Sequence, residues 1–395
     1  MTKTVSASVF QVFYIFLLLG LTSFGGPVAH IGYFHQEFVT RRKWLSDEQF
    51  SQLLAICQFI PGPASSQLGF AIGLSRAGGL GALAAFIGFT LPSVLALVMF
   101  VSLLPLLSEG LGQALVHGLK IVAFVVVTDA VIGMANKLCT DNARKTIALS
   151  TAGLLLLISS SFAQIAIIIA AGLIGLKLFK TEAKTEHAGW SIDLPKWLST
   201  LCLFSFLGLL TLTFWPSELI SHSIFASFYQ AGSLVFGGGH VVLPYLEQSF
   251  VATGLLDKET FLAGYGAVQA VPGPLFTFAS YLSAVVATEL PSWLIILIGT
   301  LAVFLPGFLL LLAVLPKWQT ISANNNAKAA ISGVNAAVVG LLAAALYDPI
   351  FTSSILSATD LVIAIVGFGI LVVWKKPPIW VVIWGIVASL AMYWF

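Results

Sequence analysis

The chain consists of long apolar runs separated by short polar segments. Several runs are long enough to cross the hydrocarbon core of a bilayer as one helix, among them residues 80–105, 112–135, 291–315 and 377–395. The one long polar stretch covers residues 177–196. This pattern predicts a bundle of membrane-crossing helices with a solvated linker near the middle of the chain.

Two helix-breaking motifs interrupt the apolar runs, and each occurs twice. Ser-Phe-Gly-Gly-Pro at residues 23–27 returns as Val-Phe-Gly-Gly-Gly at 235–239, and Gln-x-x-Pro-Gly-Pro at 58–63 returns at 269–274. The copies are offset by 212 residues for the first motif and by 211 for the second. Matching breaks inside the apolar stretches of both halves indicate an internal duplication, which is typical of membrane transporters.

The duplication divides the chain into three parts. We expect a first transporter repeat over residues 1–180, a charged linker with a connecting helix over 181–220, and a second repeat over 221–395. An odd number of crossings between the copies would invert the second relative to the first. The predicted fold class is an all-α polytopic membrane protein with two inverted-topology repeats and broken or re-entrant helices.

Positive charges in the loops favour re-entrant hairpins at both motifs. If each motif-bearing segment returns to its own side, the loops that carry Lys and Arg fall on the cytoplasmic side with the N-terminus, as the positive-inside rule requires. If every apolar segment crosses once instead, the three adjacent cations at residues 41–43 fall outside. The hairpin arrangement fits the charges better, and it rests mainly on these three residues.

Composition excludes several classes of protein. Hydrophobic residues make up 58% of the 395 residues and charged residues only 9%, which is too few charges for a soluble protein. The formal net charge of +2 is too small to indicate nucleic-acid binding. Cys57, Cys139 and Cys202 are isolated and lack metal-ligand spacing. We therefore expect a lipid bilayer as the surroundings and neither a metal nor another cofactor.

Sequence signatures of enzymes are also missing. The chain contains no His-Glu-x-x-His, no Gly-x-Ser-x-Gly and no nucleotide-binding Gly-x-x-x-x-Gly-Lys-Ser/Thr sequence. An intramembrane enzyme is therefore a weaker alternative to a transporter, and a pump that hydrolyses ATP within this chain is disfavoured.

The broken helices suit the binding of an anion. Glycine in each motif permits unusual backbone angles, and proline suits the first turn of a new helix. A half-helix that starts inside the membrane presents free N–H groups and about half a positive charge. Four such starts sum to about two positive charges, which match a small dianion such as a tetrahedral oxyanion. Simple kinks are the alternative, and four matched breaks disfavour it.

Side chains beside the breaks can add hydrogen bonds to an anion. The candidate donors are the hydroxyls of Ser23, Ser65 and Ser66 and the amides of Gln58 and Gln269.

Lys120 is the most suggestive single charge. It lies about a third of the way into the apolar run 112–135, and an ionisable residue inside the membrane indicates a functional site. Snorkelling of its long side chain to the outer interface is the alternative. The equivalent position in the second repeat is Asn335, so a site that used both residues would be asymmetric.

Three further residues are candidates for proton coupling. Asp129 lies later in the same predicted helix as Lys120, and His30 and His240 lie just past the two Phe-Gly-Gly motifs. An interfacial cap is the alternative for Asp129, and a structural role is the alternative for each histidine.

The order and duplication of the motifs resemble the chromate ion transporter family in its two-domain, long-chain form. Ser-Phe-Gly-Gly-Pro, Arg-Arg-x-Trp-Leu and Gln-x-x-Pro-Gly-Pro carry the resemblance, which extends from about Val9 to the C-terminus. The resemblance implies a secondary transporter that exports chromate across the bacterial inner membrane, with sulfate as the chemical mimic. It also implies that efflux is driven by membrane energetics rather than by a bound nucleotide.

The resemblance also implies which residues form the substrate site. In the first copy the motif residues are Phe24, Gly25, Gly26, Pro27, Gln58, Pro61, Gly62 and Pro63. In the second copy they are Phe236, Gly237, Gly238, Gln269, Pro272, Gly273 and Pro274. Gly239 stands where the first copy has Pro27. Transport of sulfate or another small oxyanion is the first alternative, and assembly into a homo-oligomer is left open.

Overall fold

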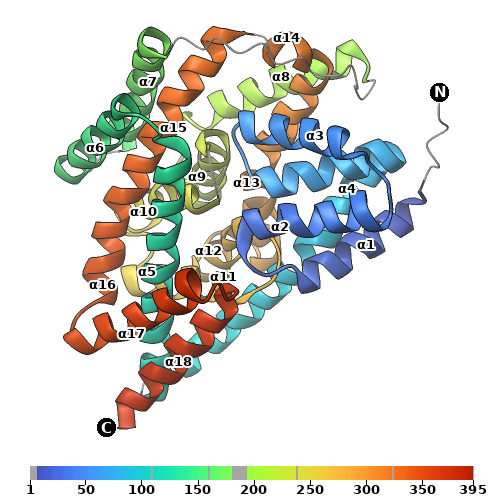
Figure 1. Ribbon diagram of the computed structural model, residues 1–395. Helices are drawn as coiled ribbons and strands as arrows, with labels where there is room; N and C mark the ends of the chain where they lie inside the picture. Colours follow the sequence, from blue (N-terminus) through green and yellow to red (C-terminus); the bar gives the residue numbers. More distant parts are fainter. Residues whose placement is uncertain are drawn as a thin grey trace. The chain divides into compact units, whose positions relative to one another are not determined.

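The computed structural model describes residues 7–107, 110–158, 161–179, 194–236, 239–322 and 324–394. Within these ranges the chain is helical and contains no β-strand (Figure 1). The all-α fold expected from the sequence is confirmed.

The helices of the two halves follow each other in the same order. In the first half they are α1 (Val9–Thr22), α2 (Gly26–His35), α3 (Asp47–Phe59), α4 (Ala64–Leu103), α5 (Leu111–Leu138), α6 (Asn142–Leu157) and α7 (Ser161–Leu178). The helix α8 (Lys196–Leu212) connects the halves. In the second half they are α9 (Ile220–Leu234), α10 (Val242–Phe250), α11 (Lys258–Ala270), α12 (Phe278–Val285), α13 (Ser292–Val314), α15 (Asn325–Ala345), α17 (Ala358–Phe368) and α18 (Pro378–Trp394), with the short helices α14 (Trp318–Ser322) and α16 (Thr352–Ser354) on either side of α15.

Short irregular turns extend several of these helices. A π-helical turn, η1 (Gln36–Arg41), continues α2, and another, η6 (Leu346–Phe351), follows α15. The 3₁₀ turns η3 (Gly239–Val241) and η4 (Leu275–Thr277) precede α10 and α12 at the two breaks of the second half.

The first Phe-Gly-Gly segment is a helical hairpin. The ring of Phe16 in α1 lies 5.6 Å from that of Phe34 in α2 and 5.1 Å from that of Phe38 in η1. Because Phe16 lies before the break at Gly25 and both of its partners lie after it, α2 and η1 run back along α1.

The first Pro-Gly-Pro segment is a second hairpin. Arg76 Nη1 donates a hydrogen bond of 3.4 Å to the carbonyl oxygen of Trp44, and the guanidinium carbon lies 5.1 Å from the centre of the Trp44 ring. Residue 76 therefore returns to the place where α3 begins. The Arg42 guanidinium also lies over the Trp44 ring, at 5.9 Å. Two cations thus gather at the same end of this hairpin.

The long helix α4 consists of two antiparallel limbs. Ala77 and Gly78 have non-helical backbone angles, with φ of +64° at Gly78. A Cβ on Gly73 would lie 2.8 Å from the Cβ of Ala85, whereas twelve residues of straight helix span about 18 Å. The first limb (residues 64–76) therefore ends at this turn, and the second limb (79–103) runs back beside it.

The chain forms two compact units, each of which contains parts of both halves. The first unit comprises Met1–Val98, Lys184–Gly239 and Val271–Ala323. The second comprises Met99–Ala183, His240–Ala270 and Asn324–Phe395.

In the first unit, matching glycines pack helices backbone to backbone. A Cβ on Gly20 in α1 would lie 2.7 Å from the carbonyl oxygen of Phe89 in the second limb of α4. At the equivalent place in the second half, a Cβ on Gly232 in α9 would collide with the carbonyl oxygen of Val303 in α13. Close contact at small residues is how membrane helices associate without a hydrophobic driving force.

In the second unit, the long helix of each half packs on the last helices of the other half. Helix α5 packs on α17 and α18, and α15 packs on α6 and α7. A Cβ on Gly118 of α5 would lie 2.6 Å from the carbonyl oxygen of Gly385, and one on Gly333 of α15 would collide with the carbonyl oxygen of Ala171. The duplicated halves are therefore exchanged within this unit.

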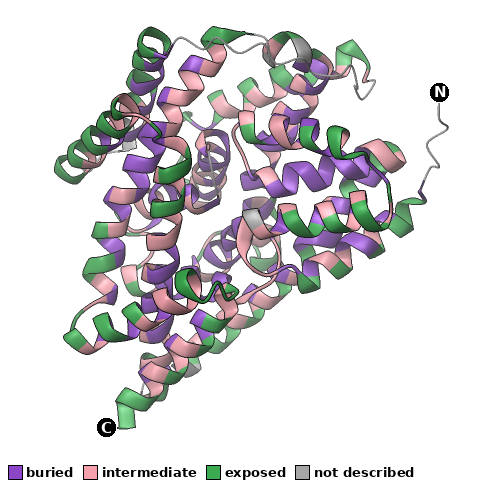
Figure 2. Ribbon diagram, viewed as in Figure 1, coloured by how far each residue is buried: buried purple, intermediate pink, exposed green. Residues whose placement is uncertain are grey.

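Many helices carry exposed residues along one face (Figure 2), and large apolar side chains are among them. Examples are Phe10, Leu157 and Trp197, with exposed fractions of 75%, 83% and 66%. Among the described residues, four helical segments are long and apolar enough to cross a membrane: Ala64–Leu103, Leu111–Leu138, Ser292–Lys317 and Asn325–Ser354. A bilayer accommodates such a surface, and the chain is a multi-pass membrane protein.

Candidate anion site at the helix breaks

The four breaks in the chain belong to the first unit, and three of them have left-handed glycines in the described residues. Gly25 and Gly26 have φ of +105° and +72°, Gly62 has φ of +120°, and Gly273 has φ of +105°. Side chains are strained at such angles, so these turns depend on glycine. Gly237 and Gly238, predicted site residues of the second Phe-Gly-Gly break, lie outside the described residues.

Proline plays a different part in the two kinds of break. Pro27 lies in the first turn of α2, as predicted. By contrast, α4 begins at Ala64, and the carbonyl oxygen of Pro63 accepts the N–H of Gln67 at 2.9 Å. Pro274 is likewise the residue before η4. The last proline of each Pro-Gly-Pro therefore precedes the new helix instead of starting it, and its carbonyl oxygen accepts the first hydrogen bond of that helix.

The Pro-Gly-Pro break of each half is hydrogen-bonded to the Phe-Gly-Gly break of the other half. The N–H of Gly62 donates to the carbonyl oxygen of Val235 at 2.8 Å, and the N–H of Gly273 donates to that of Ser23 at 3.0 Å. Val235 and Ser23 each precede the phenylalanine of their motif. These two glycine N–H groups are thus engaged by the protein. The free N–H groups are instead those of the first helical turn, such as Ala64 and Ser65, which no helix can satisfy internally.

Both Pro-Gly-Pro glycines lie against a proline-containing helix of the other half. A Cβ on Gly62 would lie 2.9 Å from the Cα of Gly307 in α13. A Cβ on Gly273 would lie 2.9 Å from Ser93 Oγ in the second limb of α4. Gly307 and Ser93 each follow a proline inside their helix, Pro306 and Pro92. Neither position has room for a side chain.

Three helix starts meet in this region. A Cβ on Gly239, the first residue of η3, would lie 3.3 Å from the side chains of Pro27 and Leu275. These two residues lie in the first turns of α2 and η4. The hydrogen bond from Gly62 to Val235 brings the start of α4 to the same region. The partial positive charges of four helix starts are therefore concentrated in one part of this unit.

Polar side chains are buried beside the start of α4. Ser23, His30 and Gln67 are fully buried, and Ser65 and Ser66 are 3% exposed. His30 Nε2 lies 3.1 Å from the carbonyl oxygen of Ser23, and His30 Nδ1 lies 3.4 Å from Ser65 Oγ. The histidine therefore joins the Phe-Gly-Gly break to the first turn of α4.

Three of these side chains have polar atoms without a hydrogen-bond partner among the described residues. They are Ser23 Oγ, Ser66 Oγ and Gln67 Oε1. Buried polar atoms are nearly always hydrogen-bonded to protein or ordered water. Unpartnered atoms in and beside the first turn of α4 therefore indicate a place for a polar ligand or water.

Gln67 is the residue that the sequence analysis missed. Its Nε2 donates to the carbonyl oxygens of Pro61 at 2.9 Å and Gly307 at 3.0 Å, so the amide ties the break to α13. The available signal was a glutamine in the first turn after Pro-Gly-Pro, inside an otherwise apolar helix. The predicted donor Gln58, in contrast, is exposed near the end of α3.

The other predicted side chains lie in the second unit and form pairs there. Lys120 Nζ lies 3.6 Å from Glu259 Oε1, and His240 Nδ1 lies 2.6 Å from the hydroxyl of Tyr265. Gln269 Nε2 donates to the Tyr265 carbonyl oxygen at 3.4 Å.

Asn335 and Asp129 complete this group of predicted residues. Asn335 Oδ1 is buried without a partner among the described residues. Asp129 is half-buried in α5. The structure thus brings the serines and His30 together at the breaks, while Lys120 and Asn335 belong to the other unit.

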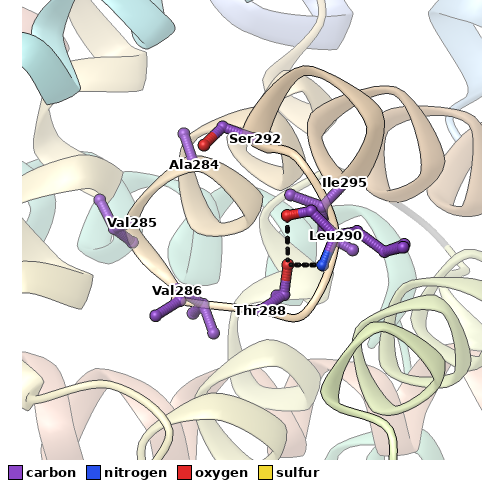
Figure 3. Close-up of a pocket in the computed structure, with 8 residues that line it drawn as sticks. Ala284, Val285, Val286, Thr288, Leu290, Ser292 and Ile295 are labelled. Atoms are coloured by element: carbon purple, nitrogen blue, oxygen red, sulfur yellow. Dashed lines mark hydrogen bonds between the residues drawn. The ribbon is translucent and has the colours of Figure 1, made fainter.

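A separate pocket of about 350 Å³ lies where α12 leads into α13 (Figure 3). Its wall comprises apolar side chains together with Thr288 and Ser292, and no lining residue is ionisable. The pocket lies between the C-terminal end of α12 and the first turn of α13, and the dipoles of these two helices present opposite partial charges to it. With no charged side chain in its lining, it is a weaker candidate for an oxyanion than the helix starts at the breaks.

Comparison with known proteins agrees with the duplication. The family model described as "Chromate transporter" matches residues 10–176 and again residues 222–390. An uncharacterized transporter of Methanocaldococcus jannaschii is 26% identical over 87% of this chain and 85% of its own length. A chromate transport protein of Pseudomonas aeruginosa is 29% identical over 86% and 80%. A probable chromate transport protein of Synechococcus elongatus is 29% identical over 85% and 83%.

No solved structure matches the chain significantly. The family model covers both halves and most of the chain, and it falls on the same two segments that carry the repeated breaks. The chain therefore belongs to the chromate transporter family.

Proposed function

We propose that this protein exports chromate across the cytoplasmic membrane and holds the anion at the helix starts beside its breaks. Ser66 carries the proposal: its buried hydroxyl, in the first turn of α4, has no hydrogen-bond partner among the described residues. A helix start combines free N–H groups with a partial positive charge, so it attracts an oxyanion without a lysine or arginine.

The binding mode follows from the groups at this start. The N–H groups of Ala64, Ser65 and Ser66 and the Ser66 hydroxyl are donors, and an oxyanion offers only acceptors. His30 positions Ser65 through its hydrogen bond. The starts of α2, η3 and η4 add their partial charges, which sum with that of α4 to about two positive charges. The remaining motif residues shape the turns that make these starts.

Alternating access is proposed to arise from the duplicated halves. The repeats over residues 1–180 and 221–395 take opposite orientations in this proposal, with a cytoplasmic N-terminus and re-entrant hairpins at the breaks. Movement of one set of helices against another then opens the site to each side in turn. In this proposal Lys120 and Asn335 interact with the anion along its path. Asp129, His30 and His240 are the candidates for carrying protons.

Sulfate is the competing substrate, because hydrogen bonds from N–H and hydroxyl groups fit both tetrahedral dianions. Inverted membrane vesicles that contain the protein should accumulate labelled chromate above vesicles without it, and unlabelled sulfate in excess should reduce the uptake. An imposed pH gradient should change the rate if protons are coupled. Accumulation of sulfate but not chromate would replace the proposed substrate, and uptake of neither would remove the proposed transport activity.

A further inference from the structure

Lys120 is a buried cation with an exposed partner. Its side chain is 7% exposed, and its Nζ lies 3.6 Å from Oε1 of Glu259, whose side chain is 77% exposed. An ammonium inside a membrane helix is costly without an anion nearby. Because Glu259 is exposed to its surroundings, its carboxylate can leave the pair and be solvated, whereas the ammonium stays buried.

The backbones around the pair fix the position of the ammonium. Helix α5 packs directly on α11, where a Cβ on Gly266 would collide with the Leu119 carbonyl oxygen. Glu259 lies in the first turn of α11, and Gln269 lies in its last turn. The Lys120 ammonium therefore lies at the end of α11 that is opposite to the motif residue Gln269.

A second ion pair holds the same end of α11. Lys258 Nζ donates to Asp348 Oδ1 at 2.9 Å and lies 3.3 Å from Thr352 Oγ1. Because this neighbouring bond ties α11 to η6, the helix does not depend on Glu259 alone for its attachment. The Glu259 carboxylate is thus free to exchange partners.

We infer that Glu259 is a tethered counter-ion. Its carboxylate pairs with the Lys120 ammonium between transport events, and a substrate oxyanion displaces it from that ammonium. This inference rests on the proposed function, in which an oxyanion passes Lys120. It assigns Glu259 to substrate affinity: the carboxylate competes with the anion for one ammonium. Its removal should therefore strengthen the interaction with substrate, whereas the loss of a merely structural pair would not.

The test is the half-saturation concentration of chromate uptake in inverted vesicles. Glu259→Gln should lower it by about threefold, the equivalent of a surface-exposed ion pair. Glu48→Gln is the matched control, because Glu48 occupies the equivalent position of the first repeat and is exposed in the first turn of α3. That variant should behave as the wild type. A double variant, Lys120→Met with Glu259→Gln, should show no gain over Lys120→Met alone.

The outcomes separate the inference from the proposed function. An unchanged or higher half-saturation concentration in Glu259→Gln overturns the inference. The proposed function still stands in that case if Lys120→Met loses transport while the wild type and Glu259→Gln transport chromate. Normal transport by Lys120→Met overturns the inference together with the role of Lys120. If Glu259→Gln does not reach the membrane, Glu259→Ser serves as a second neutral variant with the same expectation.

Discussion

At the residue scale, the candidate site combines predicted and unexpected side chains. Ser23, Ser65 and Ser66 could be identified because hydroxyls beside a helix break can donate to an anion. Gln67 was visible as a glutamine in the first turn after Pro-Gly-Pro, but its hydrogen bond to the carbonyl of Gly307, 240 residues away in the chain, was not. The Lys120–Glu259 pair was hidden for the same reason, since it joins helices of opposite halves.

Gln67→Leu should destabilise the protein. The substitution removes the donor for the carbonyls of Pro61 and Gly307, and a buried group left without a partner costs about 1–3 kcal/mol. A lower thermal unfolding midpoint in detergent checks this, with the exposed Gln36→Leu as control. Unfolding of Gln67→Leu at the wild-type temperature would show that the amide does not brace the break.

Lys120→Met should reduce chromate transport by at least about tenfold, because a buried ammonium beside a dianion contributes more than 1.4 kcal/mol. Lys120→Arg should keep part of the activity, since it keeps the charge. Initial uptake rates, normalised to the amount of protein in the membrane, measure both effects. Equal rates for Lys120→Met and the wild type would indicate that the Lys120 side chain only extends its ammonium to the membrane–water interface.

At the scale of elements, the apolar runs and the helix breakers predicted where helices begin and end more fully than single side chains predicted their contacts. The breaks at residues 23–26 and 61–63 and the hairpins that they create follow from Gly and Pro inside apolar runs. The turn at Ala77–Gly78 falls between the first Pro-Gly-Pro hairpin and the apolar run 80–105, which the sequence analysis treats as separate segments. The pairing of each Pro-Gly-Pro break with the opposite Phe-Gly-Gly break needed the three-dimensional structure.

Gly62→Leu and Gly273→Leu should each abolish transport. Both positions have positive φ and lack space, since a Cβ would meet Gly307 Cα at 2.9 Å or Ser93 Oγ at 2.9 Å. Gly153→Leu is the matched control, because nothing lies within 4 Å of a Cβ there. Uptake and membrane abundance are measured together. Wild-type uptake by both break variants would place the anion elsewhere.

At the scale of the whole molecule, the duplication was visible in the sequence and the exchange between halves was not. Matching motifs at two offsets are sufficient to predict two repeats. They do not predict that α5 packs on α17 and α18 while α15 packs on α6 and α7. Each of these contacts joins a helix of one copy to a helix of the other copy, and the motifs within a copy carry no information about such contacts. The orientation of the repeats follows only from the loop charges, so it needs a direct test.

Cysteines at Thr40 and Leu256 test the inverted topology. Once the three native cysteines are replaced, Thr40→Cys should react with a membrane-impermeant thiol reagent only from the cytoplasmic side, and Leu256→Cys only from outside. Intact cells and inverted vesicles give the two exposures. Labelling of Thr40→Cys in intact cells would contradict the re-entrant arrangement of the first repeat.

The affinity of Ser66→Ala for chromate tests the central claim most directly, because this variant removes one proposed contact without filling the break. Ser66 Oγ is buried and has no protein partner among the described residues, so its loss should leave stability unchanged. The half-saturation concentration for uptake should rise about tenfold, the equivalent of one hydrogen bond to a charged group. Ser389→Ala removes a buried hydroxyl from α18 that likewise has no partner in the described part of the chain, and it should leave uptake unchanged. Identical chromate affinity in Ser66→Ala and the wild type would contradict an anion site at the start of α4.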